Sequence, residues 1–153
     1  MNRHPFSLVG DQAGRADDER ALLIWLRLAR IYQKVDHASA ERLRAWELSV
    51  AQFDTLTQIR AAQGLMQQEL ADRLLVTKGN ISQILDRLAA RGLIRRQQEG
   101  RASRLYLTEE GQRLMDEVVP GQEAFIAEQL RELDVTERGA LLGLLRKIDR
   151  ALL

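Results

Sequence analysis

Apolar residues recur at helical spacing along most of the chain, which predicts a mainly α-helical fold. The first stripe runs from Asp17 to Val35 and begins with acidic residues, which favour the positive end of a helix dipole. This stripe is apolar on more than one side, as is typical of a helix that packs against two partners. A short helix over 40–46 follows. Ser49 and Gln52 then form a capping box that opens a helix ending near Gly64.

The segment from Gln67 to Arg91 has the pattern of two helices joined by a tight turn. Ala71 is small at the point where the two helices must cross closely. The aliphatic positions that fix this crossing are Leu70, Leu74, Val76, Ile81 and Ile84. Gly92 follows as a helix C-cap. The spacing therefore predicts a helix-turn-helix motif.

Two short strands are predicted directly after the motif, over 93–96 and 104–107, and Gly100 is at the centre of the hairpin tip over 97–103. Further along the chain, Thr108 and Asp134 are capping residues that open two more helices. The last helix carries a regular apolar stripe of Leu141, Leu144, Leu145, Ile148 and Leu152. Helices with this surplus of apolar surface are typical of a subunit interface, so we expect a homodimer.

Charge is unevenly divided along the chain. Residues 65–107 carry eight basic and four acidic side chains, whereas the remainder carries 15 basic and 18 acidic ones. A basic segment within an acidic remainder is expected when one part of a protein meets phosphate and the rest does not. A chance excess on a solvated surface explains the charge alone equally well.

The second helix of the motif presents small, polar and basic residues outward, and none of them is acidic. This outward set comprises Thr77, Lys78, Gly79, Asn80, Ser82, Gln83 and Arg87. Asn80 and Gln83 can make bidentate hydrogen bonds to adenine, and Lys78 can reach guanine. Arg87 is placed for a phosphate. We predict that this helix enters the major groove of duplex DNA by its N-terminal end.

The hairpin adds a second basic surface. Arg101 at its tip is predicted to enter a minor groove, with Arg95, Arg96 and Arg104 along the strands beneath it. We predict all of these residues, together with Thr77, Lys78, Asn80, Ser82, Gln83 and Arg87, as the DNA-binding set.

With these motifs, the chain resembles the MarR (multiple antibiotic resistance regulator) family of winged helix-turn-helix regulators. The resemblance covers roughly 17–153 and is carried by several short motifs. These are Leu48-Ser49 with Phe53 and Leu56, Gln68-Glu69-Leu70-Ala71, Thr77-Lys78-Gly79-Asn80-Ile81-Ser82, Leu85-Asp86-Arg87-Leu88, Arg91-Gly92-Leu93-Ile94 and Leu107-Thr108-Glu109-Glu110-Gly111. The chain departs from the family in the wing, where Glu99-Gly100-Arg101 replaces Asp-x-Arg and the hairpin is a few residues shorter.

The resemblance implies a homodimer that represses genes from a palindromic operator and is released by a small, commonly aromatic or anionic, effector. We accordingly expect a flexible arm over 1–16, dimerisation helices over 17–47 and 108–153, and a winged helix-turn-helix DNA-binding domain over 48–107. Four aromatic residues could line an effector pocket, although core and interface packing is the favoured interpretation: Trp25, Tyr32, Trp46 and Phe53.

Other classes of function find less support. The chain has no cysteine and its two histidines are distant from each other, so we expect no metal site, cofactor or enzymatic activity. No apolar run could cross a membrane, and we expect a cytoplasmic protein. A winged-helix module that binds protein rather than DNA remains the alternative. Its signature would be an apolar patch on the outward side of the helix Thr77–Arg91.

Overall fold

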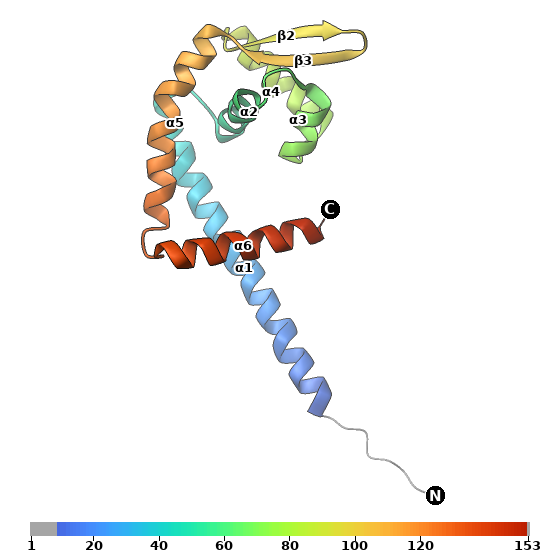
Figure 1. Cartoon of the computed structure of the whole chain (residues 1–153), viewed down its shortest axis with the longest axis vertical. Coiled ribbons are helices and arrows are strands. Elements are labelled where there is room, and N and C mark those ends of the chain that lie inside the picture. The colour runs from blue at the N-terminus through green and yellow to red at the C-terminus, as the bar shows by residue number, and fades with distance from the viewer. Residues whose placement is uncertain (1–8, 153) are drawn as a thin grey trace, which may run out of the picture. The chain divides into compact units, whose positions relative to one another are not determined.

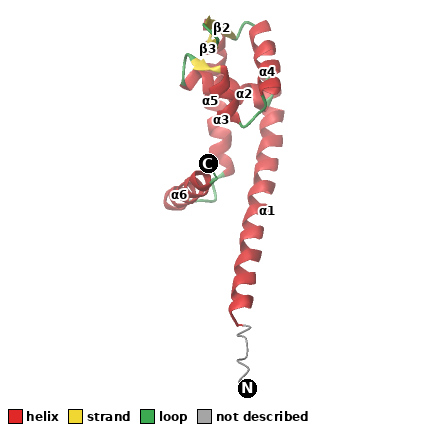
Figure 2. Ribbon diagram, turned by 90° about the vertical axis from the view of Figure 1, so that its right-hand side faces the viewer, coloured by secondary structure: helices red, strands yellow, loops and turns green. Residues whose placement is uncertain are grey.

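The computed structural model describes the backbone of residues 9–152 and the side chains of residues 14–152. Helices make up most of it, and its three strands form one small antiparallel sheet (Figures 1 and 2). The predicted fold class, mainly α with a small β-hairpin, is confirmed.

The elements follow one another in the order drawn in Figure 1. They are α1 (Val9–Leu43), the 3-10 turn η1 (Arg44–Trp46), α2 (Val50–Ala61), β1 (Leu65–Met66), α3 (Gln67–Leu74), α4 (Lys78–Ala90), β2 (Ile94–Glu99), β3 (Ala102–Leu107), α5 (Glu109–Gln129) and α6 (Val135–Ala151).

The chain divides into two compact units, residues 1–38 and residues 39–153. The first contains most of α1. Residues 1–8 of the predicted arm lie outside the described residues, and helix already begins at Val9 rather than at Asp17. Many large apolar side chains of this unit are exposed: Leu22, Leu23, Ile24, Trp25, Leu26, Ile31 and Tyr32.

The predicted separate helix over 40–46 is instead the end of α1 together with η1. A tertiary contact accounts for the difference. Ser39 is buried, and its hydroxyl accepts a hydrogen bond of 2.9 Å from the buried side-chain amide of Gln122 in α5. This contact satisfies polar groups that would otherwise favour a break in the helix.

The second unit has one apolar core, to which α2, α3, α4, α5 and all three strands contribute. Its fully buried members include Leu56, Ile59, Leu70, Ile81, Leu85, Leu88, Leu105, Met115 and Val118. The sheet has the order β1-β3-β2, with Leu65 opposite Leu105 and Ile94 opposite Leu107. The two-residue strand β1 was not predicted. It fixes the start of α3 against the hairpin.

The predicted caps are present. Ser49 and Gln52 form the capping box of α2, and the side chains of Thr108 and Asp134 accept the amide hydrogen bonds that open α5 and α6. Gly92 has a φ of +70°, as predicted for a C-cap. The hairpin is thus attached at its base to the ends of two well-capped helices.

Candidate nucleic-acid interface

The crossing of α3 and α4 positions the predicted recognition surface. Ala71 is buried at the crossing, and α4 turns Ile81, Leu85 and Leu88 into the core. The opposite side of α4 is exposed, and the side chains of Lys78, Asn80, Gln83 and Arg87 lie there. The first turn of α4 contains no acidic residue. This arrangement leaves hydrogen-bonding side chains unshielded at the N-terminal end of a rigid helix.

Two members of the predicted DNA-binding set make hydrogen bonds within the helix-turn-helix motif. The hydroxyl of Thr77 caps α4 by accepting the amide hydrogen bond of Asn80 at 3.2 Å. Ser82 is half-buried, and its hydroxyl accepts a hydrogen bond of 2.9 Å from the side-chain amide of Gln67. Gln67 is the first residue of α3, so this bond ties the two helices together. Thr77 and Ser82 are therefore engaged within the motif, whereas the side chains of Lys78, Asn80 and Gln83 are exposed.

The turn between the helices contains a residue that sequence reasoning missed. Leu75 has a φ of +53° and its side chain is 93% exposed. Non-glycine residues rarely adopt the left-handed conformation, and a leucine gains nothing there from burial. In the sequence, the exposure of Leu75 is indicated only by its position between Leu74 and Val76, both of which pack against the core.

The wing is longer in its strands and tighter in its turn than predicted. β2 and β3 are six residues each, and Glu99 pairs with Ala102, which leaves Gly100 and Arg101 as a two-residue turn. Gly100 has a φ of +60°, a conformation that glycine adopts without steric cost. Arg101 is exposed and has no partner among the described residues.

The other three arginines of the wing are engaged within the fold. Arg96 pairs with Asp86 of α4 at 2.7 Å and also donates to the carbonyl of Ser82. The guanidinium of Arg95 stacks 4.2 Å from the centroid of the Tyr106 ring. These contacts attach β2 to α4 on one side and to β3 on the other.

Arg104 is held by Glu99, and it also donates to the carbonyl of Gly64 at 3.0 Å. The hydrogen bond with Glu99, reinforced by its charge, raises the pKa of Arg104. Asp86 and Glu99 thus offset two of the cations that we assigned to DNA. Within the described part of this surface, four predicted contact residues have no acidic partner: Lys78, Arg87, Arg95, which stacks on neutral Tyr106, and Arg101.

A hollow of about 530 Å³ separates the wing turn from the two helices of the motif. Lys78 and Arg101 lie on its walls, together with Gln67, Gln68, Ser82 and Ser103, and Met66, Ala71, Ile81 and Ala102 supply the apolar part. Two unpaired cations therefore flank one depression between the first turn of α4 and the wing.

Arg91, at the end of α4, has a structural role that the sequence did not reveal. Its guanidinium donates to the backbone carbonyls of Glu47 at 2.7 Å and Trp46 at 3.1 Å. The indole of Trp46 donates in turn to Glu117 of α5 at 3.2 Å. The C-terminal end of α4 is thereby fixed to η1, and η1 is fixed to α5.

The described residues contain no group of three His, Cys, Asp or Glu side chains placed to hold a metal ion. Within the same part of the chain, no helix has both the length and the hydropathy to cross a membrane. A helix-turn-helix with an outward polar helix, followed by a β-hairpin, defines the winged helix-turn-helix class.

Comparisons with known proteins place the chain within that class. Residues 46–105 match the model of the MarR family. Over 135 residues the chain is 38% identical to an HTH-type transcriptional regulator of Bacillus cereus, and the match covers 88% of this chain and 92% of that protein. The chain belongs to the MarR family, whose members are transcription regulators and not enzymes.

Solved structures of related proteins match most of the chain. A mutant of MarR from Escherichia coli complexed with operator DNA superposes with a TM-score of 0.75 at 27% identity, covering 84% of this chain and 95% of the other. Bordetella bronchiseptica BpsR, whose DNA binding is regulated by 6-hydroxynicotinic acid, superposes with a TM-score of 0.76 at 25% identity. That match covers 83% of this chain and 98% of the other.

Proposed function

We propose that this regulator is a homodimeric repressor that binds a palindromic DNA operator through α4 and the wing, and that a small effector releases it. The observation that carries DNA binding is the exposed N-terminal half of α4, where Lys78, Asn80 and Gln83 are available for bases. Arg87, further along the helix, is available for a phosphate, and Arg101 in the wing turn is available for a minor groove. No large hydrophobic side chain is exposed from Thr77 to Arg91, where a protein-binding module would need an apolar patch, and the exposed Leu75 in the preceding turn is a single residue.

Selection of duplexes from a random pool tests DNA binding directly. A recovered palindrome with half-sites about 10 base pairs apart is expected, because a two-fold dimer presents two recognition helices about one helical turn apart. Affinity for that duplex should fall steeply with salt as cations displace counterions. Recovery of no preferred sequence at low salt would contradict the proposal.

The proposed dimer would bury apolar faces that the single chain leaves exposed. In α1, the side chains of Leu22, Leu23 and Trp25 are 57–65% exposed, and in α6, those of Leu144 and Ile148 are 61% and 46% exposed. Exposed apolar surface on this scale marks an interaction site. We therefore assign 17–47 and 108–153 to dimerisation and 48–107 to DNA binding.

Sedimentation of the full chain tests the dimer. Leu144→Glu introduces a charge on the leucine stripe of α6 and should shift the protein towards monomer. Arg146→Glu is the matched control, since Arg146 is two residues further along the same helix and points away from that stripe. A monomeric wild type, or equal effects of the two variants, would contradict the assignment.

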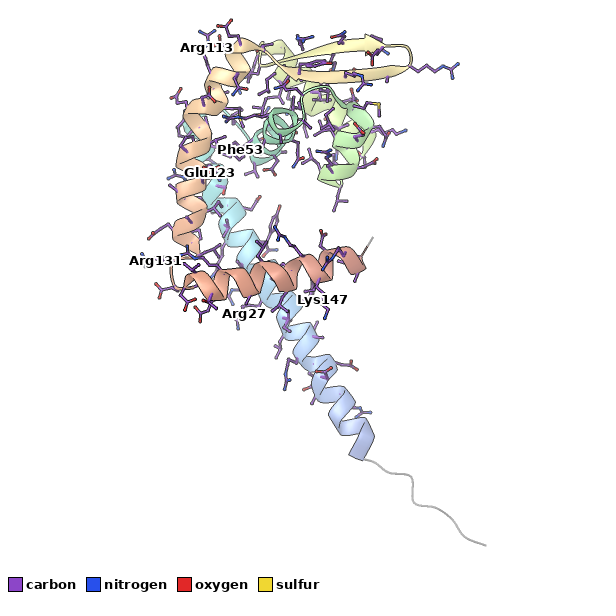
Figure 3. The ribbon with its side chains drawn as sticks, in the orientation of Figure 1. Arg27, Phe53, Arg113, Glu123, Arg131 and Lys147 are labelled. Atoms are coloured by element: carbon purple, nitrogen blue, oxygen red, sulfur yellow. The ribbon has the colours of Figure 1, made fainter. Side chains whose placement is uncertain are left out.

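A second hollow, of about 490 Å³, supports the proposed effector site. It lies between α2, α5 and the start of α6, and Phe53 and Glu123, on two of its walls, are labelled in Figure 3. Its lining is Phe53, Thr57, Val119, Gln122, Glu123, Ile126, Ala127, Leu130 and Arg138. Both the volume and the mainly apolar walls are typical of small-molecule sites.

Arg138 brings a guanidinium to this hollow, and the carboxylate of Glu123 lies on another of its walls. The Nε of Arg138 donates to the carbonyl of Leu130 at 3.1 Å, and its two terminal nitrogens have no partner among the described residues. We propose a small aromatic acid as the effector, acting in the cytoplasm, where the operator is accessible. Aromatic carboxylates should raise the melting temperature of the wild type and dissociate its DNA complex. Arg138→Gln should abolish both effects, whereas Arg146→Gln should retain them.

A further inference from the structure

Gly79 is at the centre of the outward face of α4. It is the second residue of the helix and is two residues before Ile81, which places it about 160° around the helix axis from that buried side chain. Gln83 follows one turn later on the same side. Lys78 and Asn80 flank Gly79, one on each side. The smallest residue of α4 is therefore surrounded by the three side chains that we assign to base contacts.

The fold itself does not require glycine at this position. Its φ is outside the positive region that Gly64, Gly92 and Gly100 occupy. A Cβ built on Gly79 would meet no atom within 4 Å. The helix cap is Thr77, not Gly79. None of the usual structural reasons for glycine applies here.

A glycine at this position nevertheless lowers the stability of the helix. Glycine is less favourable than alanine in a helix, because it loses more backbone freedom on folding. Gly111 of α5 shows the contrasting case, since a Cβ there would be 2.0 Å from the carbonyl oxygen of Leu93. The space that Gly79 leaves open is on the outside of the molecule, where a partner would lie.

We propose that Gly79 is a specificity-determining residue, whose missing side chain lets the first turn of α4 approach the floor of the major groove. This inference rests on the proposed binding of duplex DNA. A methyl group at position 79 would project directly towards the bases and hold the helix backbone away from them. Lys78, Asn80 and Gln83 would then lose hydrogen-bonding distance, because such bonds need donor and acceptor atoms about 2.7–3.2 Å apart.

The test compares Gly79→Ala with the wild type on the duplex that the wild type selects from a random pool. Affinity for this duplex should fall about tenfold or more, which corresponds to the loss of one good base contact. Affinity for unrelated duplexes and the dependence on salt should stay unchanged, because no cation is removed. The melting temperature should be equal or higher, which separates the loss of binding from misfolding.

Gly143→Ala is the matched control. Gly143 is within α6, is exposed, and has no atom within 4 Å of an added Cβ. It is two residues from both Leu141 and Leu145, which places it on the side of the helix away from the leucine stripe. It should share any gain in melting temperature and leave DNA affinity unchanged. If Gly79→Ala binds the selected duplex as tightly as the wild type, the inference is wrong while DNA binding stands. An equal loss on all duplexes would also overturn it. If the wild type selects no duplex, the proposed function fails first.

Discussion

Replacement of Gly111 by alanine should destabilise the protein, although alanine is the better helix former. A Cβ at this position would be 2.0 Å from the carbonyl oxygen of Leu93 and 2.9 Å from its carbonyl carbon, where ordinary contacts begin at 3.4 Å. Both atoms belong to the backbone at the base of the wing, so no side-chain rotation relieves the overlap. The same carbonyl accepts the amide hydrogen bond of Thr108, the cap of α5, at 3.1 Å.

The size of the effect follows from these contacts. Overpacking of this kind costs about 3 kcal/mol, and a weakened hydrogen bond adds about 1 kcal/mol. The higher helix propensity of alanine offsets about 1 kcal/mol of this loss in the free energy of unfolding. We therefore expect Gly111→Ala to lower the free energy of unfolding by about 3 kcal/mol, and the melting temperature by about 6–12 °C.

Gly121→Ala, in the same helix, is the control with the opposite expectation. The nearest atom to an added Cβ is a terminal nitrogen of Arg42 at 3.6 Å, an ordinary contact with a flexible side chain. Its stability should be unchanged or raised by up to about 1 kcal/mol. Both variants are measured by urea unfolding followed by circular dichroism, at one protein concentration because a dimer's stability depends on it. A Gly111→Ala protein as stable as Gly121→Ala would refute the reasoning.

Three further predictions concern single side chains. Arg87→Ala should weaken binding to all duplexes and reduce the salt dependence by about one unit of slope, whereas Asn80→Ala should also relax base preference, as titrations on matched and altered duplexes would show. Asp86→Asn should tighten DNA binding at low salt by removing an anion from α4. It should change the melting temperature little, because the pair with Arg96 is exposed. Ser49→Ala should lower the free energy of unfolding by about 1 kcal/mol in urea titrations, through loss of the α2 cap. Equal losses of affinity on all duplexes for Arg87→Ala and Asn80→Ala would contradict the first expectation. Unaltered DNA affinity of Asp86→Asn would contradict the second, and unaltered stability of Ser49→Ala the third.

Local patterns were sufficient to predict the helix-turn-helix. The crossing residue Ala71, the buried face of α4 and the caps at Ser49 and Thr108 all depend on neighbours within a few positions. Periodicity and capping chemistry report such neighbours directly. The predicted helix boundaries were less accurate where distant contacts decide them. Ser39 lies 83 positions from Gln122, and no local pattern reveals that α1 continues past it.

The charges of the wing were harder to predict than its position. The register of the hairpin decides which partners its arginines have. It places Arg96 beside Asp86 and Arg104 beside Glu99, where their side chains pair within the fold. The sequence places Gly100 in the turn but does not fix a two-residue loop, because a longer tip satisfies the same glycine signal. A shift of one residue would turn each arginine to the other face of the sheet.

The attachment of Arg91 has a mechanical consequence for α4. The guanidinium of Arg91 donates to two backbone carbonyls of the segment that follows α1. The indole of Trp46, in that segment, donates to Glu117 of α5. The C-terminal end of α4 is thus fixed to the segment before α2 and, through it, to α5, while its N-terminal end is attached to α3 by Ser82. A displacement of α5 would therefore act on α4 at its C-terminal end, through the three hydrogen bonds of Arg91 and Trp46.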